Sequence, residues 1–135
     1  MNTTTTMLQT HPHGIPQQQL AVLTACLDAC QACEQACTQC ADACLSEQSL
    51  DQLASCIATN LDCADICAAT AHITARHTAF NSDTAAAVLA ACETTCRACA
   101  QECEQHAEHH QHCKICAEVC GQCEQACRDL RAQLG

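Results

Sequence analysis

The residues with the clearest chemistry are cysteines, which number eighteen in a chain of 135 residues. They recur at alternating steps of four and three residues, a rhythm that places side chains along one face of a helix. Core positions of packed helices follow this rhythm, with leucine where this chain has cysteine. Thiolates select soft ions such as Cu(I), zinc and iron in iron–sulfur clusters. The series are Cys26, Cys30, Cys33, Cys37, Cys40 and Cys44; Cys56, Cys63 and Cys67; Cys92, Cys96, Cys99 and Cys103; and Cys113, Cys116, Cys120, Cys123 and Cys127.

These series require four helices to position them. Residues 1–16 are expected to be a flexible N-terminal arm that ends at Pro16, and residues 17–135 a single domain. Phe80 is the one aromatic residue and alanine is abundant, which favours close helix packing over strands. The helices are expected at about 17–45, 50–77, 83–106 and 110–134. Because short turns make neighbours antiparallel, the prediction is an all-α, up-down-up-down four-helix bundle with a cysteine-lined core.

Three local signals locate the turns. Ser49-Leu50-Asp51-Gln52 matches a capping box at the start of the second helix, and Asn81 or Ser82 is a candidate cap for the third. The turn between the last two helices lacks Gly and Pro. There the Cys103 and Cys113 series fall out of phase, so the chain is expected to reverse between them.

The antiparallel order gives the bundle two different ends. One end holds the chain termini and is expected to be plugged by packing, mostly of leucines. The other end is expected to form a mouth through which ions enter. The plug comprises Leu23, Thr70, Thr74, Leu89, Leu130 and Leu134, and the mouth Cys44, Cys56, Cys103, Cys113, His106, His109 and His110.

Charge balance ranks the soft metals. Zinc takes four ligands, so unshared thiolates would hold about four Zn²⁺ and leave about ten negative charges uncompensated. Burying unpaired charge is very costly. If thiolates bridge Cu(I) ions, one ion can be bound for each thiolate, and the positive and negative charges of the core then cancel. The spacing therefore favours many Cu(I) ions, about one for each cysteine.

Other uses of the cysteines are less consistent with the spacing. Thiols along one straight helix satisfy disulfide geometry badly, although bonds between helices could form under oxidation. An inert thiol core accounts for one or two buried cysteines better than for eighteen in register. An iron–sulfur electron carrier is an alternative because Cys-x-x-Cys pairs occur, but such pairs usually lie in loops that wrap a cluster. Sequestration of zinc or another heavy metal is the remaining alternative.

Non-cysteine ligands are also candidates. Asn60 stands where the rhythm calls for a cysteine, and both a structural hydrogen bond and a ligand role are open for it. His106, His109, His110 and His112 lie together beside the mouth, where some are expected to bind metal; His106 and His110 are best placed. His11 and His13 could bind a metal, although a solvated tail is the simpler interpretation, and His72 and His77 are expected on the surface.

The composition argues against several classes of function. The formal net charge of −10 leaves no basic patch for nucleic acid. No apolar run is long enough to span a membrane, and residues 1–16 show no export signal, so the cytoplasm, where thiols stay reduced, is expected. No nucleophile–base arrangement stands out, and a filled core leaves no substrate pocket, so an enzyme is not expected.

The cysteine pattern, Asn60 and the turn from His106 to Cys113 together resemble the bacterial copper storage protein family, in its cytosolic branch. The resemblance covers nearly the whole chain after Pro16. It implies a four-helix bundle, assembly as a homotetramer, storage of many Cu(I) ions by core thiolates, and a role in copper buffering or detoxification. A copper chaperone is a candidate donor or acceptor.

Overall fold

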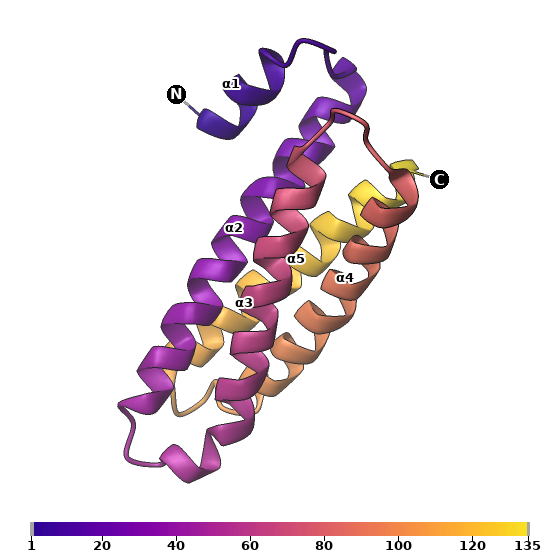
Figure 1. The fold of residues 1–135 in the computed structure, drawn as a ribbon. Helices are drawn as coiled ribbons and strands as arrows, with labels where there is room; N and C mark the ends of the chain where they lie inside the picture. The colour runs from indigo at the N-terminus through magenta and orange to yellow at the C-terminus, as the bar shows by residue number, and fades with distance from the viewer. Residues whose placement is uncertain (1, 135) are drawn as a thin grey trace.

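The computed structural model describes residues 2–134, which form five α-helices and a short 3₁₀ helix with no strand among them. Four long helices lie side by side in one elongated bundle, and the short α1 lies near the end that holds the termini (Figure 1). Met1 and Gly135, the outermost residues of the expected arm and domain, lie outside the described residues. The elements are α1 (Thr3–Gln9), α2 (Gln17–Leu45), η1 (Leu50–Gln52), α3 (Ala54–Ala75), α4 (Ser82–Glu104) and α5 (Gln111–Leu134).

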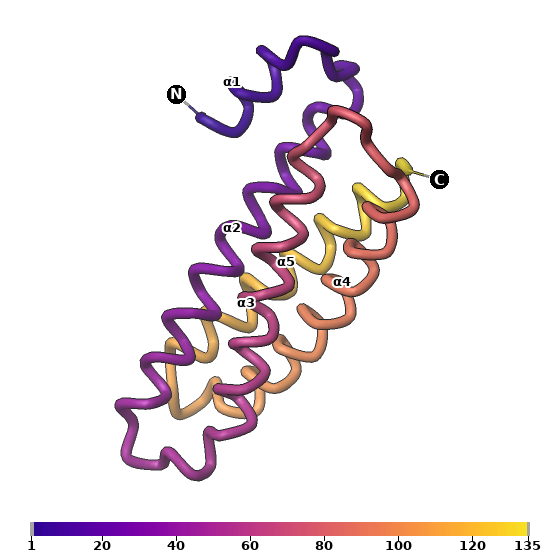
Figure 2. The backbone as a smooth tube through the Cα atoms, viewed as in Figure 1, coloured from indigo at the N-terminus to yellow at the C-terminus, as the bar shows by residue number. Residues whose placement is uncertain are grey.

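The four long helices alternate in direction along the chain, as the tube in Figure 2 shows. Helix α2 packs against α3 and α5, and α4 packs against the same two helices. Each helix therefore turns one face toward a common axis. This arrangement confirms the predicted all-α, antiparallel bundle.

The start of α3 differs from the prediction. Ser49 makes no capping hydrogen bond with its side chain, so the predicted capping box is wrong. The chain instead forms η1, closed by hydrogen bonds from Gln52 N–H to the Ser49 carbonyl and from Leu53 N–H to the Leu50 carbonyl, each 3.0 Å long. Helix α3 begins only at Ala54 and ends at Ala75, because Arg76 has an extended backbone.

The two later turns lie where the sequence indicates them. Asn81 caps α4, since its side-chain oxygen accepts the Thr84 N–H at 3.0 Å, and α4 begins at Ser82. The last reversal spans residues 105–110, between the two cysteine series that are out of phase. Helix α4 therefore ends at Glu104, two residues earlier than expected, and α5 begins at Gln111.

The N-terminal segment is more ordered than the expected flexible arm. Residues Thr3–Gln9 form α1, although threonine has a low helix propensity. Asn2 caps this helix by accepting the Thr5 N–H at 2.9 Å, and Leu8 is buried in the same apolar cluster as α2. A cap and one buried leucine together offset the weak propensity of the threonines.

Among residues 2–134, none of the helices combines the length and the apolar character that a membrane span requires.

Candidate metal core

All eighteen cysteines are free and point into the bundle, where each is at most 1% exposed. The alternating steps of four and three residues explain this, because they keep each series on the inward face of its helix. The Cys-x-x-Cys pairs consequently lie inside α2, α4 and α5 and not in loops that could wrap a cluster. Only α3 has a sparser series, with Asn60 between Cys56 and Cys63.

The sulfur atoms form a continuous column and not separate sites. Sulfurs on different helices approach within 3.6–3.9 Å, as between Cys37 and Cys120 and between Cys67 and Cys123. Groups of four lie with all sulfurs within 4.8 Å of one another, and neighbouring groups share members such as Cys33 and Cys37. The groups include Cys30, Cys92, Cys123 and Cys127; Cys33, Cys63, Cys67 and Cys96; Cys33, Cys37, Cys63 and Cys120; Cys37, Cys99, Cys116 and Cys120; and Cys40, Cys44, Cys56 and Cys113.

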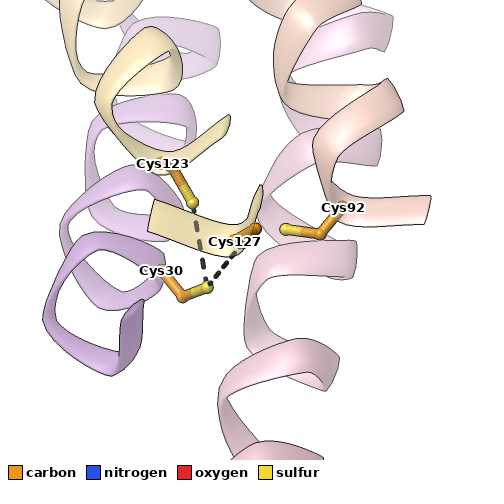
Figure 3. A group of neighbouring side chains, drawn as sticks. All are labelled: Cys30, Cys92, Cys123 and Cys127. Atoms are coloured by element: carbon orange, nitrogen blue, oxygen red, sulfur yellow. Dashed lines mark hydrogen bonds between the residues drawn. The ribbon is translucent and has the colours of Figure 1, made fainter. Parts of the chain in front are cut away.

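Figure 3 shows how one group draws its members from three helices. Cys30 comes from α2, Cys92 from α4, and Cys123 and Cys127 from α5. The Cys30 sulfur lies 3.7 Å from that of Cys123 and 3.8 Å from that of Cys127. With metal–sulfur bonds of about 2.3 Å, sulfurs around one ion lie about 3.8–4.6 Å apart, from tetrahedral to linear geometry. The column therefore accepts ions after small outward shifts of its thiols.

Asn60 is fully buried and organises the thiols around it. Its side-chain oxygen accepts S–H hydrogen bonds from Cys99 at 3.0 Å, Cys116 at 3.2 Å and Cys103 at 3.5 Å. Its amide nitrogen donates to the Cys56 sulfur at 3.6 Å. The structural hydrogen-bonding role considered from the sequence is therefore present, and the same oxygen lies among thiols where a metal ion could reach it.

The thiols nearest the mouth differ in acidity. Burial raises the pKa of Cys44 to about 11, and burial also raises the pKa of Cys113. A hydrogen bond with Cys103 lowers the pKa of Cys56 far below that of an ordinary thiol. Binding of a cation displaces protons from these buried thiols, and a thiol with a lowered pKa loses its proton most readily.

His112 reaches the thiols at the mouth. Its Nδ1 lies 3.4 Å from the Cys40 sulfur and 3.6 Å from the Cys113 sulfur. Its Nε2 lies 3.0 Å from a carboxylate oxygen of Glu47. Because a carboxylate can only accept, Nε2 carries the proton, and the lone pair of Nδ1 faces the sulfurs. Sequence reasoning grouped His112 with the mouth but did not select it, and it did not consider Glu47.

The two selected histidines, His106 and His110, have carboxylates as their partners. His110 pairs with the same Glu47 carboxylate as His112. The buried Nε2 of His106 lies 3.6 Å from Glu102 Oε1, which is too far for a hydrogen bond. This nitrogen has no hydrogen-bond partner among residues 2–134. His109 is exposed. A usable signal for His112 was its position four residues before Cys116, which places it on the inward side of α5.

The opposite end of the column carries the expected plug. Leu23, Leu89 and Leu130 are buried there. Thr70 and Thr74 are buried too, and their hydroxyls donate to the carbonyls of Ile66 and Thr70 at 2.7 Å. These hydroxyl groups are thus already hydrogen-bonded to the backbone. A small cavity of about 70 Å³ remains beyond the plug, lined by Leu23, Thr74, His77, Phe80, Leu130 and Leu134, with Gln19 and Gln133.

Comparison with known proteins agrees with this geometry. The copper storage protein (Csp) family model matches residues 19–132. The copper storage protein Ccsp of Streptomyces lividans, loaded with ten copper equivalents, is 47% identical with a TM-score of 0.93, over 96% of this chain and 98% of its own. No curated protein sequence matches the chain.

Two further solved structures are similar. The cytosolic copper storage protein of Streptomyces lividans with five coppers is 49% identical, with a TM-score of 0.87 over 89% of this chain and all of its own. The Cu(I)-bound copper storage protein BsCsp3 is 35% identical, with a TM-score of 0.72 over 81% of this chain and 97% of its own. By the match of its sequence, its bundle and its cysteine-lined core, the chain belongs to the copper storage protein family.

Proposed function

We propose that the protein stores Cu(I) in its sulfur column, with a capacity of about one ion for each of its eighteen cysteines. The main observation behind this proposal is that every cysteine is buried, free and within contact distance of thiols on other helices. Eighteen thiolates that bridge eighteen Cu(I) ions give a neutral column, whereas about four Zn²⁺ in unshared tetrahedral sites would leave buried negative charge. The Cu(I)-bound relative supports the same metal and oxidation state.

Anaerobic titration of the reduced protein with Cu(I) tests this capacity. Thiolate-to-copper absorption in the ultraviolet should rise until about eighteen equivalents are bound, and metal analysis against sulfur should give a ratio near one. Saturation at about four ions would indicate separate tetrahedral sites of the zinc type. Iron and acid-labile sulfide in protein purified without air would instead support the iron–sulfur alternative.

The mouth is proposed as the route of loading. His106 and His110 are the proposed non-thiol ligands there, together with His112, which lies against Cys40 and Cys113. Replacing His106 and His110 with alanine should change the rates of Cu(I) uptake and of release to a chelator more than it changes capacity. A large loss of capacity in this double variant would place ions in positions that depend on the two imidazoles.

Asn60 is proposed as an additional ligand, because its oxygen already faces three thiols. In an Asn60→Ala variant, extended X-ray absorption and the Cu(I) stoichiometry should show fewer non-sulfur contacts and a smaller number of ions. An unchanged spectrum and stoichiometry would restrict Asn60 to organising the copper-free thiols.

The proposed setting is the reducing cytosol, since all eighteen thiols are unpaired and one relative is described as cytosolic. A homotetramer and exchange of copper with a chaperone are further proposals. Light scattering of the purified protein gives the subunit number, and transfer from a Cu(I)-loaded chaperone can be followed by the thiolate absorption. A catalytic activity is not proposed, because the thiols fill the interior of the bundle.

A further inference from the structure

A second cluster of histidines lies at the plugged end of the bundle. His11 and His13 precede α2, and His77 follows α3. The ring centroids of His11 and His13 lie 5.4 Å apart, and those of His11 and His77 lie 6.2 Å apart. His77 is more than sixty positions from His11 and His13 in sequence, and the folded N-terminal segment brings them together.

The loop that carries His11 and His13 is ordered by its own sequence. The Gly14 N–H donates to the His11 carbonyl at 2.9 Å, which closes a turn with Pro12 and His13 at its centre. Gly14 has a φ of 68°, a conformation that favours glycine. Buried Leu8 anchors the preceding helix α1 to the bundle. The two histidines are therefore held near the end of α3.

The tautomer of His77 leaves a lone pair for a cation. His77 Nε2 lies 2.9 Å from the Thr74 carbonyl, so that nitrogen carries the proton and Nδ1 is free to coordinate. His11 Nδ1 accepts the His13 backbone N–H at 3.1 Å, a hydrogen bond that a metal ion could replace.

The separations of His11 from His13 and of His11 from His77 are compatible with imidazoles around one ion. With metal–nitrogen bonds of about 2.0–2.1 Å, ring centroids lie about 5 Å apart in a tetrahedral site and about 6.5 Å apart in a linear one. The 5.4 Å between His11 and His13 is close to the tetrahedral value, and the 6.2 Å between His11 and His77 is closer to the linear value. The rings of His11 and His77 are inclined at 79°, so His11 must rotate to aim its lone pair at the shared point. Phe80 stacks on His77 at 5.1 Å and holds that ring in place.

We propose that His11, His13 and His77 form a site for one divalent transition-metal ion, separate from the thiol column. Imidazole suits ions such as Ni²⁺, Zn²⁺ and Cu²⁺. The leucine plug separates this site from the thiols, because His77 lines the small cavity beyond the plug together with Leu23 and Leu130. The ion joins the segment before α2 to the segment after α3 and so holds α1 against the bundle.

The test uses protein whose thiols are already saturated with Cu(I) under anaerobic conditions, so that added Ni²⁺ meets no free thiol. Equilibrium dialysis should give one Ni²⁺ per chain. Paramagnetic broadening in the proton NMR spectrum should affect the ring signals of His11, His13 and His77 and spare those of His106 and His109. The variant with both His11→Ala and His13→Ala, at positions outside the core, should bind Ni²⁺ at least about tenfold more weakly, the loss expected for removing metal ligands or their support.

Two further variants keep the test decisive. His77→Gln preserves an amide donor to the Thr74 carbonyl and should weaken binding to a similar extent, whereas exposed His109→Ala at the other end should not. Unchanged affinity in the His11/His13 double variant, broadening confined to His106 and His109, or no binding at millimolar Ni²⁺ would each overturn the proposal. The Cu(I) capacity is measured on every variant beforehand, so failure of this site is distinct from failure of the thiol store.

Discussion

The two ends of the bundle are built from the same four helices, but they present opposite chemistry to the axis. At the mouth, Cys40 and Cys113 lie against an imidazole that Glu47 orients. At the plugged end, leucines and backbone-bonded threonine hydroxyls close the column. An ion can exchange from thiol to imidazole at the first end, whereas at the second it meets hydrocarbon. The difference predicts that ions enter and leave at the mouth, although the sulfur column itself is continuous.

The largest effect is expected when one buried leucine is replaced at each end of the bundle. Leu89 at the plug and Leu53 near the mouth are both fully buried. Leu89→Ala and Leu53→Ala should each lower the free energy of unfolding of the copper-free protein by about 2–5 kcal/mol, because both leave cavities. Only Leu89→Ala should accelerate chelator-driven loss of Cu(I) from the loaded protein. Urea unfolding and stopped-flow absorbance measure the two effects, and equal release rates would mean that the plug does not limit ion loss.

A smaller effect is expected from Asn60, which lies in the half of the column toward the mouth. Asn60→Ala removes the acceptor of three thiols and should lower the free energy of unfolding of the copper-free protein by about 1–3 kcal/mol. The matched control is Thr70→Val on the same helix, where a buried hydroxyl bonds only to its own backbone. If both variants lose the same free energy of unfolding, the thiol hydrogen bonds of Asn60 contribute no more to stability than the hydroxyl of Thr70.

Glu47 tests the mouth through kinetics and affinity. Glu47→Gln should leave the total capacity unchanged but lower the affinity for the ions nearest His112 by about tenfold. Loss of the group that orients a ligating histidine typically has this effect. Competition with a Cu(I) chelator measures the weakest sites of the loaded protein. Glu104→Gln, at an exposed position at the same end, is the control. An identical competition curve for wild type and Glu47→Gln would remove Glu47 from the loading route.

The smallest expected effect concerns pH. Burial lowers the pKa of His77 below its unfolded value of about 6.5, so the unfolded chain takes up a proton first and stability falls as pH drops below about 6.5. Hydrogen bonding by His112 lowers the pKa of Glu47, so its contribution is present above about pH 4.3 and is lost as pH falls through its lower folded pKa. Urea unfolding of copper-free wild type and His77→Gln at pH 7.5 and 5.5 should show less acid sensitivity in the variant.

Several parts of the site were predictable from the sequence because they depend on spacing within one helix. The series from Cys26 to Cys44 places six thiols on one face of α2, and the phase slip after Cys103 locates the last turn. The capping-box prediction at Ser49 was wrong because the chain forms η1 after Ser49, and the Ser49 side chain makes no capping hydrogen bond. The flexible arm was expected from composition, and the burial of Leu8, a contact distant in sequence, produces α1 instead.

By itself, the sequence determined the helical class, the inward face of each helix and the soft-metal character of the core, because a period of 3.6 residues acts locally. Only the tertiary structure decided which thiols meet across helices, such as Cys33 with Cys63 and Cys120. It also decided that His112 lies beside the thiols and that His11 approaches His77. Such contacts depend on the axial shift and rotation of one helix against another, which are set by turns and packing and not by spacing along a single helix.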